Sequence, residues 1–328
     1  MFVNMVTFLV ILLLIFINGI TDASNAVATV IGTKVLSYRK ACILSALMNA
    51  VGVTMMFRYN QSITSTVSEM VRLPQTKLGL SIICIAMLTT ILFSLLSLLK
   101  GVPASESYGL IFGMIGASVA AIGFQSVNFN KVRLILIGLV FSIIGSVIIT
   151  RVVDMCISHI ILKLNVKMVK KLQIISCMGM SFAHGAQDGL KFIGILKLYE
   201  QIVTQNVMIQ KDSIIVSLCA FTMALGTMIG GKRIIISVGK DLTSLNHQTA
   251  LISEIGTIIT LLLGNIFRTS IKYESRENHF MCQYWKRYQS QKTAKNATNM
   301  VFCFAILCRH VLFFYENSNI NKFYLKRG

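Results

Sequence analysis

Two stretches of the sequence decide the fold: Asn18-Gly-Ile-Thr-Asp-Ala-Ser-Asn25 and His184-Gly-Ala-Gln-Asp-Gly-Leu-Lys191. In both, a glycine is followed by an aspartate three residues later, and a polar side chain follows three residues after that. Each stretch lies in a long apolar run, where an ionised carboxylate costs roughly 2.5–3.5 kcal/mol. A matched pair of such motifs indicates an internal repeat and favours a functional role for Asp22 and Asp188.

The composition defines the class of protein. Of 328 residues, 55% are hydrophobic and only 13% are charged, about half the charged share of a soluble domain. The apolar residues occur in runs of helical length, which excludes a soluble domain, a disordered chain and an outer-membrane barrel. We expect an all-α polytopic membrane protein. Its predicted spans are Phe2–Ile17, Ala41–Phe57, Leu78–Leu99, Val102–Phe124, Leu134–Leu164, Leu172–Leu198, Ser213–Ile229 and Leu251–Phe267.

The basic residues orient the spans. The net charge of +19 sits mostly between apolar runs, where positive loops stay on the cytoplasmic side, so nucleic acid is not an expected partner. Lys34, Arg39 and Lys40 place the loop after the first motif inside and the N-terminus outside. Lys163 and Lys171 place the start of the second half inside as well. The halves therefore enter the membrane from opposite sides, as in the inverted-topology repeats of secondary transporters.

The repeat also predicts the organisation of the chain. Residues 1–164 form the first repeat, with a re-entrant hairpin near 101–123, and residues 165–267 form an incomplete second repeat. The hairpin begins at Gly101, 82 residues after Gly19, and the same spacing after Gly185 leads to Phe267. There the composition changes, and residues 268–328 form a basic, aromatic-rich tail to which no membrane fold is assigned.

The motif residues suggest ion chemistry. A Gly-x-x-Asp-x-x-Asn sequence can break a helix and expose carbonyls to a cation. Asp22 and Asn25 share one helical face, so both oxygens can reach one ion. Lys191 stands where the first copy has Asn25, and it would pair with Asp188 or contribute positive charge to an anion. His184 is a candidate proton carrier or a plain hydrogen-bonding residue, and Glu254 is a weaker candidate of the same kind.

A second motif suggests an anion site. In Gly101-Val-Pro-Ala-Ser-Glu-Ser-Tyr108, Pro103 interrupts an apolar run, and short hydroxyl side chains precede a helix start. Hydroxyls and bare N–H groups can hold a tetrahedral oxyanion. The alternative is a serine-rich turn between two spans. Glu106 does not fit an anion site unless it is protonated or faces the loop.

These residues resemble a known family. Asn18–Thr33 is similar to the signature of the PiT inorganic phosphate transporters, Phe182–Lys191 to its second copy, and Gly101–Tyr108 to its hairpin motif, usually Gly-x-Pro-x-Ser-x-Ser/Thr-His. Gly230–Gly239 also matches a family segment. The resemblance covers roughly Met1–Phe267.

The resemblance implies an alternating-access symporter of phosphate with sodium ions or protons. It implies an ion site, for sodium if the protein is sodium-coupled, at Asp22, Asn25 and Asp188. The second hairpin is missing near Phe267, and a frameshifted or truncated gene would produce such a tail and an impaired product. Tyr108 departs from the usual histidine, and Gln187 from the usual asparagine. The implied substrate site comprises Asp22, Asn25, Ser105, Ser107, Gln187, Asp188 and Lys191.

Other functions remain open from the sequence. A near alternative is a permease for sulfate or a related oxyanion, and one of another class is a non-transporting remnant or regulatory membrane protein. An enzyme is not expected, because the sequence has no Walker loop and no visible nucleophile–base set. No cofactor is expected beyond the coupling ion. The expected location is the cell membrane, and the expected partners are phosphate, a coupling cation, lipid and a second copy of the chain.

Overall fold

The computed structural model describes residues 2–100, 106–204, 212–232, 234–235 and 247–266, without the side chains of 23–25, 139–144, 162, 249 and 264–266. These residues are almost entirely helical, so the all-α class is confirmed. The helices are α1 (Phe2–Gly32), α2 (Tyr38–Tyr59), α3 (Ser62–Ser68), α4 (Lys77–Lys100), α5 (Glu106–Ile122), η1 (Phe124–Ser126), α6 (Phe129–Lys163), α7 (Val166–Thr204), α8 (Asp212–Ile229) and α10 (His247–Ile266).

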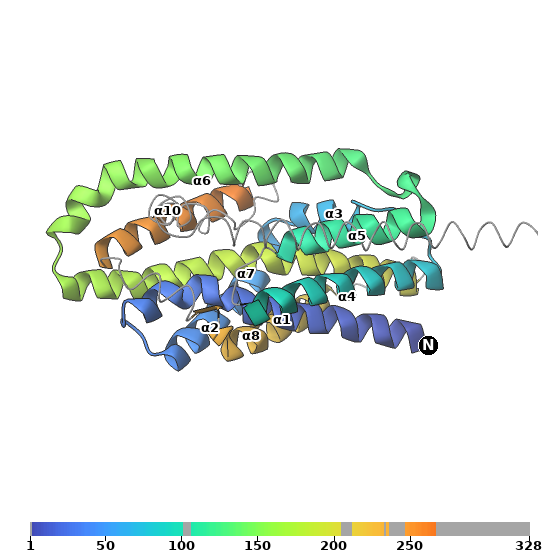
Figure 1. The fold of residues 1–328 in the computed structure, drawn as a ribbon, viewed down its shortest axis with the longest axis horizontal. Coiled ribbons are helices and arrows are strands. Elements are labelled where there is room, and N and C mark those ends of the chain that lie inside the picture. The colour runs from blue at the N-terminus through green and yellow to red at the C-terminus, as the bar shows by residue number, and fades with distance from the viewer. Residues whose placement is uncertain (1, 101–105, 205–211, 233, 236–246, 267–328) are drawn as a thin grey trace, which may run out of the picture.

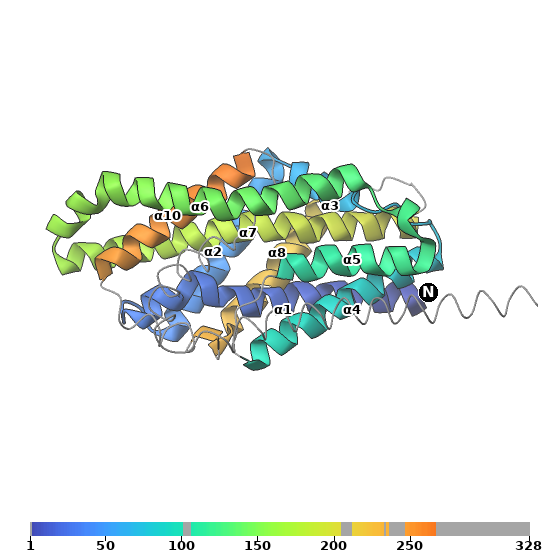
Figure 2. The same ribbon diagram turned by 45° about the horizontal axis from the view of Figure 1, so that its top comes forward.

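The long helices lie side by side along one axis of the molecule. In Figure 1, α7 runs through the middle, α6 forms one edge, and α1, α2, α4 and α8 lie on the other side. The turned view in Figure 2 brings α5 forward beside α4 and α1. Where it is described, each predicted apolar run lies largely within one long helix. Among the described helices, α1, α2, α4 and α8 are long and apolar enough to cross a membrane.

The polarity of the bundle is reversed relative to a soluble protein. Large apolar side chains such as Leu92 and Phe221 are more than 60% exposed, whereas Asp22, Asp188 and Lys191 are at most 7% exposed. A soluble fold would expose the charges and bury the apolar groups. The outer surface is therefore suited to lipid, and the polar groups face the interior.

The segment predicted to form a re-entrant hairpin is described only from residue 106 onward, so the hairpin itself stays a prediction. The described part of 101–123 is the single helix α5, and it packs against α4. A Cβ on Gly113 would lie 3.0 Å from the carbonyl oxygen of Ala86 on α4, and one on Gly109 would lie 3.1 Å from Thr90. These glycines therefore allow the close approach of α5 to α4. Residues 101–105, the position of the missing second hairpin at Phe267 and the predicted tail lie outside the described residues.

The first motif sits at a tight crossing between α1 and α8. A Cβ on Gly19 would lie 2.3 Å from the carbonyl oxygen of Met223, and a Cβ on Gly226 would lie 2.1 Å from that of Phe16. Neither distance is sterically allowed for a side chain. The backbones of α1 and α8 are therefore in direct contact, and this contact requires glycine on both sides.

The second motif sits at a matching crossing between α7 and α2. A Cβ on Gly185 would lie 2.2 Å from the carbonyl oxygen of Asn49, and a Cβ on Gly52 would lie 2.2 Å from that of Phe182. The two crossings share one geometry. In each, the glycine of one helix approaches a carbonyl oxygen that lies three residues before the glycine of the other helix. The two motifs therefore pack in the same way, the first against α8 and the second against α2.

The helix is continuous through both motifs. α1 extends without interruption over 31 residues and α7 over 39 residues. The prediction that the Gly-x-x-Asp sequence unwinds the helix is wrong at both positions. The physical reason is that Gly19 and Gly185 serve the tight crossings, while the aspartates bind side chains rather than freed backbone groups.

Candidate functional site

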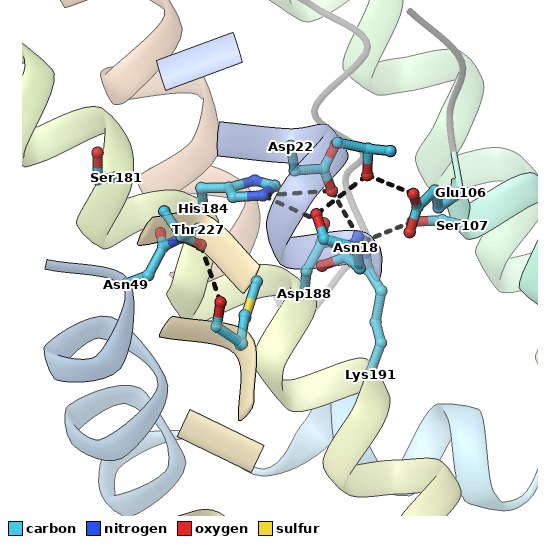
Figure 3. Close-up of polar contacts among 12 residues, drawn as sticks. Asn18, Asp22, Asn49, Glu106, Ser107, Ser181, His184, Asp188, Lys191 and Thr227 are labelled. Carbon is cyan, nitrogen blue, oxygen red and sulfur yellow. Dashed lines mark hydrogen bonds and ion pairs between the residues drawn. The ribbon is translucent and has the colours of Figure 1, made fainter. Parts of the chain in front are cut away.

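The two motif aspartates meet where α1 passes α7. Nε2 of His184 lies 3.3 Å from Oδ2 of Asp22 and 3.7 Å from Oδ2 of Asp188. One ligand atom from each of these three side chains lies within 4.8 Å of the other two, and all three side chains are buried. The imidazole therefore stands between the carboxylates of the two motifs, as Figure 3 shows.

Asn18 completes the surroundings of the first carboxylate. Its Nδ2 donates a hydrogen bond of 2.5 Å to Oδ2 of Asp22, one helical turn further along α1. Asn18 holds the position in the first copy that His184 holds in the second, so each copy places a nitrogen donor four residues before its aspartate. No role for Asn18 is predicted from the sequence, although the i, i+4 spacing could have indicated one.

Lys191 pairs with the second carboxylate and reaches α5. Its Nζ donates a hydrogen bond of 2.6 Å to Oδ1 of Asp188 and another of 2.9 Å to Oγ of Ser107. The lysine is only 4% exposed. The structure thus brings Lys191 and Asp188 together at the spacing that the sequence predicts, and it joins both to the first turn of α5.

Glu106 faces the first motif. The hydroxyl of Thr21 on α1 donates a hydrogen bond to Oε1 of Glu106 at the start of α5, and Glu106 is buried. The motif sequence alone leaves the role of this residue open. A third carboxyl group therefore stands beside the two motif aspartates.

Several of these groups line one small pocket, although Asp22 and His184 do not. Its walls come from α1, α5 and α7, and its volume is about 10 Å³, which is room for about one water molecule. Phosphate does not fit into this volume. Two of the pocket's lining residues, Lys191 and Ser107, are hydrogen-bonded to each other. The lining residues are Asn18, Glu106, Ser107, Leu110, Asp188, Lys191 and Phe192.

Other predicted residues lie elsewhere or outside the described part. Nε2 of Gln187 donates to the carbonyl oxygen of Leu261 on α10, so this side chain turns to a different neighbour from that of Asp188. Glu254 on α10 accepts a hydrogen bond from Ser176 on α7 and does not line the pocket. Ser105 and the side chain of Asn25 are outside the described residues.

The electrostatic balance of the site is unusual for a buried cluster. Asp22, Asp188 and Glu106 bring three acidic groups, while Lys191 brings one fixed positive charge. The imidazole of His184 adds a second positive charge only when it is protonated. A buried acidic excess is costly unless positive charge compensates it. The site is therefore suited to take up protons or small cations.

The sequence and the fold match known transporters. The model of the phosphate transporter family matches residues 18–170 and 163–271. A probable low-affinity inorganic phosphate transporter of Bacillus subtilis is 32% identical over 231 residues, which cover 68% of each chain. Its counterpart from Mycobacterium bovis is 29% identical over 261 residues, 77% of this chain and 61% of that protein. A solved structure named the sodium-dependent phosphate transporter has the same fold, with a TM-score of 0.77, 16% identity and 99% of both chains covered.

The family match covers more than half of the chain, and it includes both aspartate motifs and the α5 segment. It confirms the family that the motif residues predict. The chain belongs to the phosphate transporter family.

Proposed function

We propose that this protein transports inorganic phosphate across the cell membrane by symport with sodium ions or protons. The observation that carries this proposal is the cluster of three buried carboxyl groups, two of which line one small pocket, with Lys191 as the fixed positive charge among the described residues of the cluster. The names of the relatives support phosphate as the substrate, and the name of the structural neighbour supports sodium as one candidate ion.

The charge balance gives a physical basis for coupling. Phosphate carries one to two negative charges near neutral pH, so it is repelled by a site in which Asp22, Asp188 and Glu106 are ionised. Bound cations or protons remove this repulsion, and the anion in turn favours their binding. Coupling then follows because neither partner occupies the buried site well without the other.

The anion would bind between α5 and α7. Ser107 lies in the first turn of α5, and the N–H groups at a helix N-terminus favour negative charge. Lys191 donates to Ser107 and brings a fixed positive charge beside it. With Ser105 before it, as the family resemblance implies, Ser107 supplies the hydroxyl donors. Asp22, Asn25, Gln187 and Asp188 complete the proposed ion and substrate region.

Transport would proceed by alternating access. We divide the chain into a first repeat of residues 1–164, a second repeat of 165–267 and a tail of 268–328. The matched crossings of Gly19 with Gly226 and of Gly185 with Gly52 support this division. Rocking of the repeats about these backbone contacts would open the shared site to one side and then to the other. The basic loops support an N-terminus outside, and a homo-oligomer in the membrane is part of the proposal.

Two alternatives are separated by experiment. A sulfate permease would use the same hydroxyl and N–H donors, because sulfate is also tetrahedral. A non-transporting remnant is favoured by the tail composition and by the absence of a second hairpin motif near Phe267 in the sequence. We do not assign an enzymatic activity, since the site chemistry is explained by binding of an anion and cations.

The test is uptake of labelled phosphate by the purified full-length chain in liposomes, with an inward sodium gradient or an inward proton gradient. The proposal predicts uptake above that of empty liposomes with one of the gradients, and no competition by excess sulfate. Strong competition by sulfate would support the broader oxyanion permease. A folded protein without uptake under either gradient would contradict transport and support the remnant.

A further inference from the structure

Lys191 and Asn25 hold equivalent positions in the two copies of the motif. The first copy reads Asp22-Ala-Ser-Asn25 and the second Asp188-Gly-Leu-Lys191. A neutral amide thus follows the first aspartate by three residues, and a cation follows the second at the same spacing. The two halves are therefore not electrically equivalent, although their backbones pack in the same way.

We propose that the ammonium group of Lys191 is a built-in cation that replaces an exchangeable coupling ion at Asp188. This inference rests on the proposed cation-coupled transport and specifies its site. An exchangeable cation would then bind only in the half of Asp22. The second half keeps its positive charge through the whole transport cycle, because that charge is covalently attached to α7.

The contact geometry supports this assignment. Nζ of Lys191 lies 2.6 Å from Oδ1 of Asp188, and both side chains are at least 92% buried. A metal ion cannot lie between two atoms at this distance. A second cation beside Oδ1 would face the ammonium group at close range in a medium that screens charge poorly.

The first half offers a different environment. The contacts of Asp22 include the neutral amide of Asn18 and the imidazole of His184, and the hydroxyl of Thr21 binds nearby Glu106. None of these partners carries a fixed positive charge. The carboxyl groups of Asp22 and Glu106 therefore provide the oxygen-rich, negatively charged surroundings that a small hard cation prefers.

The second hydrogen bond of Lys191 links this cation to the substrate site. Its Nζ also donates to Ser107 on α5, at 2.9 Å. The same ammonium group can therefore neutralise Asp188 and face an anion bound at α5. A mobile ion in this place would have to be bound and released in every transport cycle. The ammonium group of Lys191 stays attached to the chain and only changes between Asp188 and the bound anion as its partner.

The experiment measures equilibrium binding of labelled sodium to the purified full-length chain in lipid nanodiscs, without phosphate. Lys191→Asn should bind one more sodium ion per chain than the wild type, and the additional ion should be lost in Asp188→Asn/Lys191→Asn. The matched control is Lys197→Asn, because Lys197 lies on the same helix but pairs with Asp212 at the surface. This control should bind as many sodium ions as the wild type. An unchanged sodium count in folded Lys191→Asn would overturn the inference.

The double variant tests the inference even if Lys191→Asn does not fold, since it removes both charges and leaves no unpaired ion. It should bind as many sodium ions as the wild type. Loss of one ion in the double variant would show an exchangeable site at Asp188 and would overturn the inference. These results do not depend on uptake, so a chain that does not transport phosphate can still support the built-in cation.

Discussion

Nε2 of His184 lies 3.3 Å from Oδ2 of Asp22, so a ring from the second motif reaches the carboxylate of the first. The same ring nitrogen is 3.7 Å from Asp188, four residues further along α7. His184 is therefore a side chain that contacts both copies of the motif. A change at one aspartate alters the surroundings of the other through this ring.

His184→Asn should reduce phosphate uptake about tenfold and weaken its dependence on pH between about 5 and 8. The reason is that histidine changes its charge in this range, whereas asparagine does not. The measurement is initial uptake by liposomes containing the variant at several pH values. The exposed His159 on α6 provides the control, and His159→Asn should follow the wild-type profile. A wild-type profile in His184→Asn would contradict the role of the ring.

Ser107→Ala should raise the phosphate concentration for half-maximal uptake by about tenfold to a hundredfold. This range corresponds to the loss of about 1.5–3 kcal/mol for a hydrogen bond to a charged group. Ser118 is a matched control, because it is buried on the same helix and its hydroxyl donates to the carbonyl oxygen of Met114, one turn earlier in α5. Ser118→Ala should leave the half-maximal concentration unchanged. Equal values for both variants would argue against a phosphate contact at Ser107.

Gly185→Ala should destabilise the protein by about 1–3 kcal/mol or prevent its folding, as overpacking does in a tight core. The added Cβ would lie 2.2 Å from the carbonyl oxygen of Asn49, so α2 and α7 must separate. Gly145 on α6 has open space around its Cβ position and provides the control. The measurement is the thermal unfolding midpoint in detergent. A midpoint for Gly185→Ala equal to that of Gly145→Ala would contradict the tight crossing.

Several features of the site can be predicted from the sequence because they are local. Long hydrophobic stretches in the sequence predict the positions of the helices. The spacing of Lys191 and Asp188 along one helix predicts that they pair. The meeting of Asp22 with Asp188 follows from the repeat, since equivalent segments of two halves approach each other at a shared site.

Other features depend on how distant helices cross, and no periodicity in the sequence encodes these crossings. The contact between Glu106 and Thr21 requires α5 to lie against α1. The turn of Gln187 toward Leu261 depends on the position of α10. From the sequence alone, the motif glycines suggest a break in the helix, whereas in the structure close contacts from α2 and α8 explain them.

The central claim is that Asp22 and Asp188 form one transport site. Its most direct test measures ion-driven phosphate uptake by Asp22→Asn and Asp188→Asn at equal amounts of protein in the membrane. The control is Asp154→Asn, which changes an exposed aspartate on α6. We predict background uptake for the two site variants and wild-type uptake for Asp154→Asn. Wild-type uptake in both Asp22→Asn and Asp188→Asn would contradict the claim.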